Sequence, residues 1–133
     1  MINRLNHVGV VVADLQEAKR FLGEVLGLEL VLERDVPAKQ RRTAYFAAGG
    51  VEIELIEDLD PGAKARTLGG AAAVIEHISF DVDDLARTVE SLAANGVRLR
   101  DGEIVRVGTR DNAWTEPATS GGVMYQLSAE TTE

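Results

Sequence analysis

The stretch Leu5-Asn6-His7-Val8, followed by Asp14-Leu15, recurs later in the chain as Ile75-Glu76-His77-Ile78, followed by Asp84-Leu85. The spacing is constant, because 77 minus 7 and 84 minus 14 both equal 70. These histidines are the only two among the 133 residues. The sequence therefore indicates an internal duplication that places both histidines at equivalent positions.

A second match aligns Gly49-Gly50-Val51-Glu52-Ile53-Glu54-Leu55 with Gly121-Gly122-Val123-Met124-Tyr125-Gln126-Leu127. Its offset is 72, because 126 minus 54 equals 72, so Glu54 and Gln126 are equivalent. The glycine pairs predict turns with positive φ, a conformation that glycine adopts without steric cost. Two imidazoles, one carboxylate and one amide oxygen form a chemically suitable set of metal ligands.

The same order of elements is predicted in both halves. Apolar runs at residues 5–12 and 74–82 predict strands, and each run leads to an aspartate, Asp14 or Asp84, that can cap the N-terminus of an amphipathic helix. Three further strand candidates follow in each half: residues 28–34, 42–47 and 51–56, then residues 97–105, 112–115 and 122–128. We therefore expect an α+β fold with two tandem βαβββ modules. Residues 1–133 are expected to form a single domain, with module one at about 1–60, a linker at about 58–72 and module two at about 73–128.

Strand alternation predicts where the four candidate ligands point. Side chains alternate between the two faces of a strand, so His7 lies opposite Val8 and Val10, and Glu54 lies opposite Ile53 and Leu55. The same alternation holds for His77 and Gln126 in the second half. If helices cover the apolar side, the four ligands converge on the open concavity of the curved sheets.

Composition limits the classes of function. The chain is 45% hydrophobic and 27% charged, which is ordinary for a soluble globular protein, and it has neither a secretory signal nor a transmembrane run. We therefore expect a cytoplasmic protein without a membrane partner. A net charge of -8 argues against nucleic acid as a partner. The absence of cysteine leaves imidazole, carboxylate, amide and water as the ligands available to a metal ion.

The chain resembles the vicinal oxygen chelate superfamily, which includes glyoxalase I, methylmalonyl-CoA epimerase, extradiol dioxygenases and bleomycin resistance proteins. The resemblance runs from Leu5 to Leu127 and is carried by these stretches: Leu5-Asn6-His7-Val8-Gly9-Val10, Val25-Leu26-Gly27-Leu28, Gly50-Val51-Glu52-Ile53-Glu54-Leu55-Ile56 and Glu76-His77-Ile78-Ser79-Phe80-Asp81-Val82. Val36-Pro37 and Glu54-Leu55-Ile56-Glu57 look most like the methylmalonyl-CoA epimerase branch.

The resemblance implies a cup-shaped mixed sheet with helices outside, and a homodimer. It also implies a divalent metal ion, which could be Co, Ni, Mn, Zn or Fe, held by His7, Glu54, His77 and Gln126. Two features depart from the epimerase pattern. Gln126 stands where a glutamate is expected, and residues 41–48 contain no acid. The usual pair of carboxylate bases is therefore missing.

The function implied by this resemblance is enolisation of a small acyl or oxo substrate by a metal-dependent isomerase, epimerase or lyase. A metal that draws electron density from a carbonyl stabilises the enolate left when the α-proton is removed. Glu54 is the predicted catalytic base, because glutamine has no useful basicity. Met124 shares a face with Gln126 and is predicted to bind substrate. Trp114 is read either as a core residue or as a substrate-binding residue that lines the cup.

Two other functions stay open. The cup could belong to a binding protein for an antibiotic or a metabolite, which the missing carboxylates favour and the two retained histidines oppose. An Fe(II) dioxygenase is the third option, since two histidines and one carboxylate can form a facial triad. That option ranks last, because dioxygenase members usually take the carboxylate from the place that Gln126 fills here.

Overall fold

The computed structural model describes residues 1–132, which contacts divide into two compact units. The first unit is His7–Glu76, and the second unit joins Met1–Asn6 to the residues from His77 onward. The strands are β1 (Ile2–Val12), β2 (Glu29–Val36), β3 (Arg41–Ala48), β4 (Val51–Asp58), β5 (Ala73–Val82), β6 (Val105–Val107), β7 (Arg110–Trp114) and β8 (Met124–Glu130). The α-helices are α1 (Leu15–Arg20), α2 (Pro61–Leu68) and α3 (Leu85–Ala94), and a π-helical segment, η1 (Phe21–Val25), continues α1.

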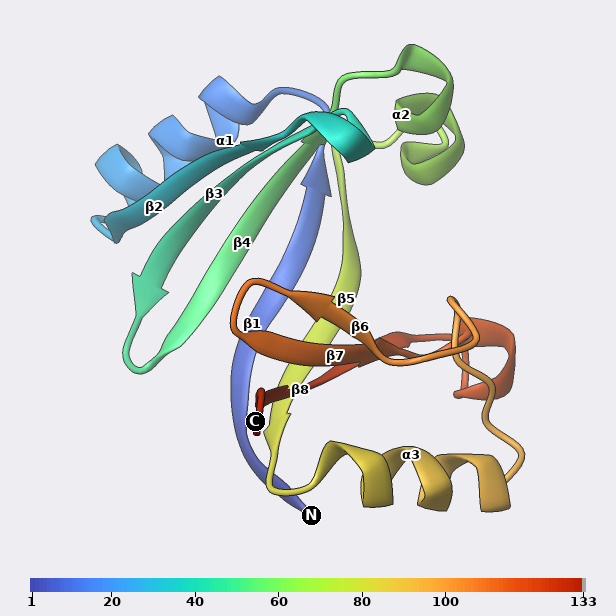
Figure 1. The fold of residues 1–133 in the computed structure, drawn as a ribbon. Coiled ribbons are helices and arrows are strands. Elements are labelled where there is room, and N and C mark those ends of the chain that lie inside the picture. The colour runs from blue at the N-terminus through green and yellow to red at the C-terminus, as the bar shows by residue number, and fades with distance from the viewer. Residues whose placement is uncertain (133) are drawn as a thin grey trace. The chain divides into compact units, whose positions relative to one another are not determined.

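In the first unit, helix α1 covers one face of the sheet (Figure 1). The strand order is β2-β3-β4-β1, with β1 and β4 parallel and the other pairs antiparallel. Asp14 caps α1 by accepting a hydrogen bond from the backbone N–H of Glu17 at 3.1 Å. The core between helix and sheet consists of Val12, Leu15, Ala44, Phe46 and Leu55. This is the face that the sequence predicts to be apolar.

The opposite face of the first unit carries His7 and Glu54 and is closed at one end by helix α2. There Leu68 of α2 packs with Val11 and Ile56 in a second buried cluster. The side chain of Asp60 accepts a hydrogen bond from the backbone N–H of Ala63 at 2.9 Å, which caps α2. This face is therefore apolar at the α2 end and polar where the two candidate ligands emerge.

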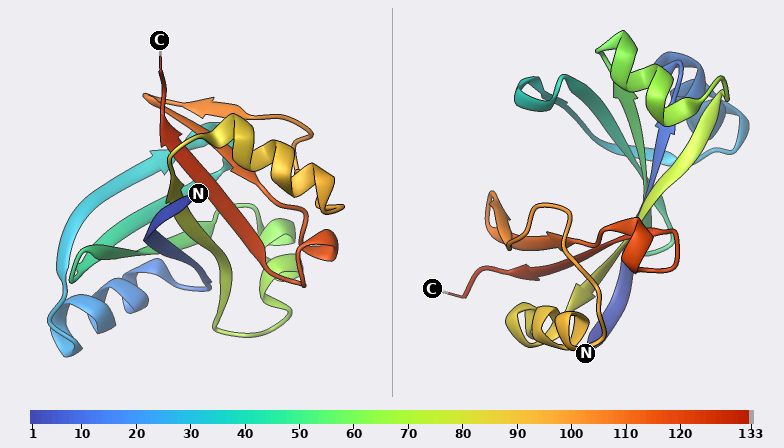
Figure 2. Two further views of the ribbon diagram at one scale, coloured as in Figure 1. Left: turned by 90° about the horizontal axis from the view of Figure 1, so that it is seen from below. Right: turned by 90° about the vertical axis from the view of Figure 1, so that its right-hand side faces the viewer.

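The second unit repeats the arrangement with β5-β8-β7-β6, in which β5 and β8 are parallel. Helix α3 packs along the sheet (Figure 2) and is capped by Asp84, which accepts a hydrogen bond from the backbone N–H of Arg87 at 3.1 Å. Buried Val82, Leu85, Ala113 and Leu127 form its core, and Val89 and Leu92 of α3 pack against them. Burying a side chain of this size contributes about 1.5–3 kcal/mol.

The predicted α+β class and the βαβββ order of both modules are confirmed, as are the mixed sheets with helices against their apolar faces. The two glycine-pair turns are also confirmed. Their φ values are 64° and 87° at Gly49 and Gly50, and 78° and 93° at Gly121 and Gly122. Among residues 1–132, no helix has the length and apolar character needed to cross a membrane.

Two details of the predicted element map are wrong. The strand expected at residues 97–105 is reduced to an isolated bridge between Leu99 and Thr115, and regular pairing resumes only with β6. Gly102, at φ 76°, interrupts the extended chain between them. The predicted linker also contains helix α2, which the sequence pattern does not predict.

Candidate metal centre

His7 and Glu54 form the centre of the polar face of the first unit. They stand on the parallel strands β1 and β4, where the register pairs His7 with Glu52 and Gly9 with Glu54. Nε2 of His7 lies 3.3 Å from Oε1 of Glu54, and both residues are buried. Two ligands of one tetrahedral zinc ion are about 3.3 Å apart, because their bonds to the metal are about 2.0–2.1 Å long. The spacing of this pair therefore suits two ligands of one ion.

Tyr45 on β3 holds the other oxygen of Glu54. The two residues are directly opposite in the antiparallel β3–β4 register, and the Tyr45 hydroxyl donates to Oε2 of Glu54 at 2.8 Å. Burial raises the pKa of Tyr45, and the neighbouring Glu54 charge raises it further. The hydroxyl therefore keeps its proton and remains a donor, which leaves Oε1 of Glu54 as the oxygen beside His7.

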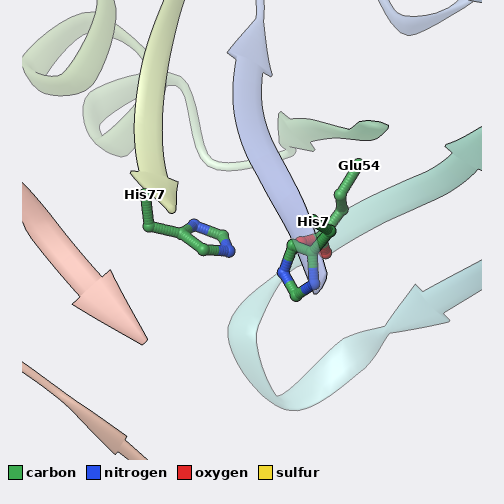
Figure 3. A group of neighbouring side chains, drawn as sticks. All are labelled: His7, Glu54 and His77. Carbon is green, nitrogen blue, oxygen red and sulfur yellow. The ribbon is translucent and has the colours of Figure 1, made fainter. Parts of the chain in front are cut away.

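His77 on β5 completes a group of three candidate ligands. The ligand atoms of His7, Glu54 and His77 all lie within 4.8 Å of one another (Figure 3). Two neutral imidazoles and one carboxylate are a donor set that zinc, cobalt, nickel, manganese and iron can each accept. The residues present thus fit a divalent ion, as three of the four predicted ligands are brought together.

Within the first unit, an ion-pair cluster fixes the residue that precedes His77. Arg41 on β3 donates to Asp58 through Nε at 2.7 Å and to Glu76 through Nη2 at 2.7 Å. Burial alone would lower the pKa of Arg41, but the hydrogen bonds and charges of Glu76 and Asp58 outweigh it and raise that pKa. The cluster anchors β5 at Glu76, one residue before His77.

Gln126 is the fourth predicted ligand. In the second unit, it lies on the same face of the sheet as His77. The parallel β5–β8 register pairs His77 with Met124 and Ser79 with Gln126, and parallel partners project on the same side of a sheet. The Gln126 amide donates from Nε2 to Oδ1 of Asn112 on β7 at 3.0 Å. Its ligation of a metal stays a prediction.

Trp114 and Met124, the predicted substrate-binding residues, lie on this same face. The antiparallel β7–β8 register sets Trp114 opposite Gln126, so Trp114 projects away from the α3 core. The Arg100 guanidinium stacks on the Trp114 ring at 4.7 Å from its centroid and donates to Sδ of Met124 at 3.7 Å. These contacts place a cation beside both residues, and their substrate-binding role stays a prediction.

The sequence does not predict the contacts that Tyr45, Asn112 and Arg100 make with the candidate site residues. Tyr45 and Asn112 are uncharged side chains that act on Glu54 and Gln126, so no charge pattern marks them. Strand alternation combined with the hairpin turn at Gly49-Gly50 could have placed Tyr45 opposite Glu54. Arg100 lies in the irregular segment before β7, and the contact of Asn112 with Gln126 depends on the register of β7 against β8, neither of which the sequence pattern gives.

Ser79, in the second unit, has a buried hydroxyl whose hydrogen bonding can be tested by substitution. The residue is 1% exposed, and within residues 1–132 its hydroxyl oxygen has no hydrogen-bond partner. A buried polar group left unpaired costs about 1–3 kcal/mol, so Ser79→Ala is expected to raise the free energy of unfolding by about 1 kcal/mol. Urea denaturation of the metal-free protein measures this change.

Ser128→Ala is the matched control for Ser79→Ala. Ser128 is also buried on this face, but its hydroxyl accepts a hydrogen bond from Nε of Arg110 at 2.8 Å. Its loss is expected to lower the free energy of unfolding by about 1 kcal/mol. Equal destabilisation by both variants would show that the Ser79 hydroxyl is paired in solution.

Known proteins match this chain along nearly its whole length. It is 30% identical over 129 residues to the uncharacterized protein YqjC of Bacillus subtilis (strain 168), covering 95% of this chain and 91% of the relative. It is 28% identical to the ethylmalonyl-CoA/methylmalonyl-CoA epimerase of Cereibacter sphaeroides, covering 96% and 98% of the two chains. The crystal structure of methylmalonyl-CoA epimerase from Mycobacterium tuberculosis superposes with a TM-score of 0.85 at 28% identity, covering 98% and 90%.

The family itself follows from a match to most of the chain. Residues 6–114 match the Glyoxalase/Bleomycin resistance protein/Dioxygenase superfamily, which is the vicinal oxygen chelate superfamily that the sequence resembles. The chain therefore belongs to this superfamily, and several of its relatives are epimerases.

Proposed function

We propose that this protein is a divalent-metal-dependent enzyme that removes and returns the proton α to a carbonyl in a small acyl substrate, as methylmalonyl-CoA epimerases do. The observation that carries the proposal is the group formed by His7, Glu54 and His77 (Figure 3). Relatives named as epimerases of methylmalonyl-CoA support it. A thioester of a branched or substituted malonate is accordingly the substrate class to test first.

The donor set defines how an ion would be held. His7, Glu54 and His77 would supply three ligands, and we propose the carbonyl oxygen of Gln126 as the fourth. A divalent ion at this place would polarise the substrate carbonyl and stabilise negative charge on its oxygen. Tyr45 then keeps Glu54 oriented by its 2.8 Å hydrogen bond.

Proton transfer needs a carboxylate near the α-carbon. Glu54, the predicted base, has both oxygens engaged, one beside His7 and one with Tyr45. Glu52 stands two residues earlier on β4, on the same face and in register with His7, and it is half-buried. We propose that Glu52 shares proton transfer with Glu54, which would restore a carboxylate pair from one strand.

The decisive experiment uses untagged protein, because a histidine tag binds metal ions itself. Addition of Co²⁺, Ni²⁺, Mn²⁺ or Zn²⁺ is expected to raise Tm. The metal-loaded protein is then expected to incorporate deuterium at the α-carbon of methylmalonyl-CoA in deuterated water. Metal binding without deuterium incorporation would favour a binding protein of the same fold. The absence of metal binding would contradict the proposal of a metal-dependent enzyme.

We also propose a homodimer. In the first unit, η1, the residue that follows it and β2 carry six exposed large apolar side chains: Phe21, Val25, Leu26, Leu30, Val31 and Leu32. Exposed apolar surface can mark a protein interface. A monomeric mass in solution would contradict this assignment.

A further inference from the structure

The orientation of the Gln126 amide is determined by Asn112. Nε2 of Gln126 donates to Oδ1 of Asn112 at 3.0 Å, and Nδ2 of Asn112 donates to the backbone carbonyl of Arg110 at 3.3 Å. The second bond directs the Asn112 nitrogen to its own strand. Oδ1 is therefore the atom that Asn112 presents to Gln126, and it can only accept.

Strand order then gives the direction of the Gln126 oxygen. Strand β8 lies between β7, which carries Asn112, and β5, which carries His77 and Ser79. Because the nitrogen of a planar amide points towards β7, its oxygen turns away from Asn112. In residues 1–132 no hydrogen bond occupies that oxygen, and the hydroxyl of its register partner Ser79 is unpaired. The oxygen is thus available on the face of His77.

We infer that Asn112 is a positioning residue that presents the carbonyl oxygen of Gln126, and not its nitrogen, to a divalent metal ion. The inference rests on the proposed function, since it assigns one more residue to the same metal centre. The first unit uses the same device with opposite hydrogen-bond polarity. There Tyr45 donates to Glu54, whereas Asn112 accepts from Gln126.

This polarity accounts for an amide at position 126. A glutamine can donate to Asn112 while its oxygen remains a ligand, whereas a glutamate has no proton to donate. In a Gln126→Glu variant, the Asn112 amide must turn over so that its nitrogen donates to the new carboxylate. An aspartate at position 112 could not do so. Positions 112 and 126 are therefore expected to depend on each other.

Four variants test this dependence: Asn112→Ala, Asn112→Asp, Gln126→Glu and the double variant N112D/Q126E. Titration calorimetry with Zn²⁺ measures the affinity of each, and Tm without metal measures the hydrogen bond alone. Asn112→Ala is expected to weaken Zn²⁺ binding by about 10- to 100-fold, as loss of a group that orients a ligand does. Asn112→Asp should bind close to wild type, because it still accepts from Gln126.

The double variant should behave differently from both single variants. Gln126→Glu should bind Zn²⁺ at least as tightly as wild type. In N112D/Q126E two carboxylates face each other in the metal-free protein, without the hydrogen bond that either single variant can form. The metal-free Tm of the double variant should fall by more than the sum of the single shifts. Ser128→Ala, which removes a neighbouring hydrogen bond on the same face, is the control and should leave the Zn²⁺ affinity unchanged.

The outcomes separate this inference from the proposed function. Failure of the wild-type protein to bind Zn²⁺ or another divalent ion would overturn the proposed metal centre. Normal binding by wild type and equally tight binding by Asn112→Ala would overturn only the role of Asn112. Additive effects of the two substitutions on the metal-free Tm would also overturn it.

Discussion

Replacing Glu54 with alanine is expected to abolish the stabilisation of the protein by divalent metal ions. Glu54 supplies the only carboxylate in the group with His7 and His77, and its Oε1 lies 3.3 Å from Nε2 of His7. An ion present at 100 times its Kd adds about 2.7 kcal/mol to the free energy of unfolding. Wild type should gain this increment on addition of Zn²⁺ or Co²⁺, and Glu54→Ala should gain none of it.

Glu52→Ala is the matched control, because it removes the same charge from the same face of β4. It should retain the metal-dependent rise in Tm while it slows deuterium incorporation at the substrate α-carbon. Glu54→Ala should lose both properties. A Glu54→Ala protein that Zn²⁺ still stabilises like wild type would show that the ion binds elsewhere, and equal loss of metal binding in Glu52→Ala would show a nonspecific charge effect.

The candidate ligands could be located from the sequence because the duplication constrains them twice. The offset of 70 equates His7 with His77, and alternation along the strands separates them from the apolar face. The first inference needs only the repeated sequence, and the second needs only local strand geometry with a period of two residues. That is why three predicted ligands, His7, Glu54 and His77, are found close together in the structure.

The residues that orient those ligands were not predicted, because their positions depend on strand register as well as on alternation. The contact between Tyr45 and Glu54 depends on the register of β3 against β4, and a shift of one residue would send the hydroxyl to the other face. Asn112 follows the segment in which a continuous strand was wrongly expected. Gln126 was therefore recognised as a departure from the epimerase pattern, but its partner was not.

Helix α2 was not predicted, because the residues that begin it stand beside glycines that are typical of a linker. Asp60 and Pro61 are a favourable N-cap and first helical residue, and both act in these roles. The neighbouring Gly62 and the Gly69-Gly70 pair instead suggested a linker. In the structure Gly69, at φ 55°, is the residue at which the helix ends. This glycine therefore indicates the end of a helix and does not argue against one.

Replacing Arg41 with methionine is expected to have the largest effect on stability. The substitution removes a cation that bonds Asp58 at 2.7 Å and Glu76 at 2.7 Å. Asp58 is 3% exposed, and its second carboxylate oxygen is buried without a hydrogen-bond partner among residues 1–132. An uncompensated buried carboxylate is costly, so Arg41→Met should lower the free energy of unfolding by about 3 kcal/mol. Urea denaturation measures the change.

Arg42→Met is the control, since Arg42 is the next residue and pairs with Asp35 on the surface, where both side chains are more than half exposed. Exposed ion pairs contribute little, so this variant should lose less than about 1 kcal/mol. Equal losses in the two variants would contradict a special role for the buried cluster. Addition of Asp58→Asn to Arg41→Met should recover part of the stability, because it removes the unpaired charge.

Arg41 also connects stability to the metal centre. Glu76 directly precedes His77 on β5, so loss of the Arg41 contact removes a side-chain anchor next to a candidate ligand. Arg41→Met is therefore expected to weaken Zn²⁺ binding by about tenfold, the lower end of the range for residues that support a ligand, whereas Arg42→Met should not. The two effects have one origin, because the ion pair that stabilises the sheet of the first unit also holds Glu76, the residue that precedes His77.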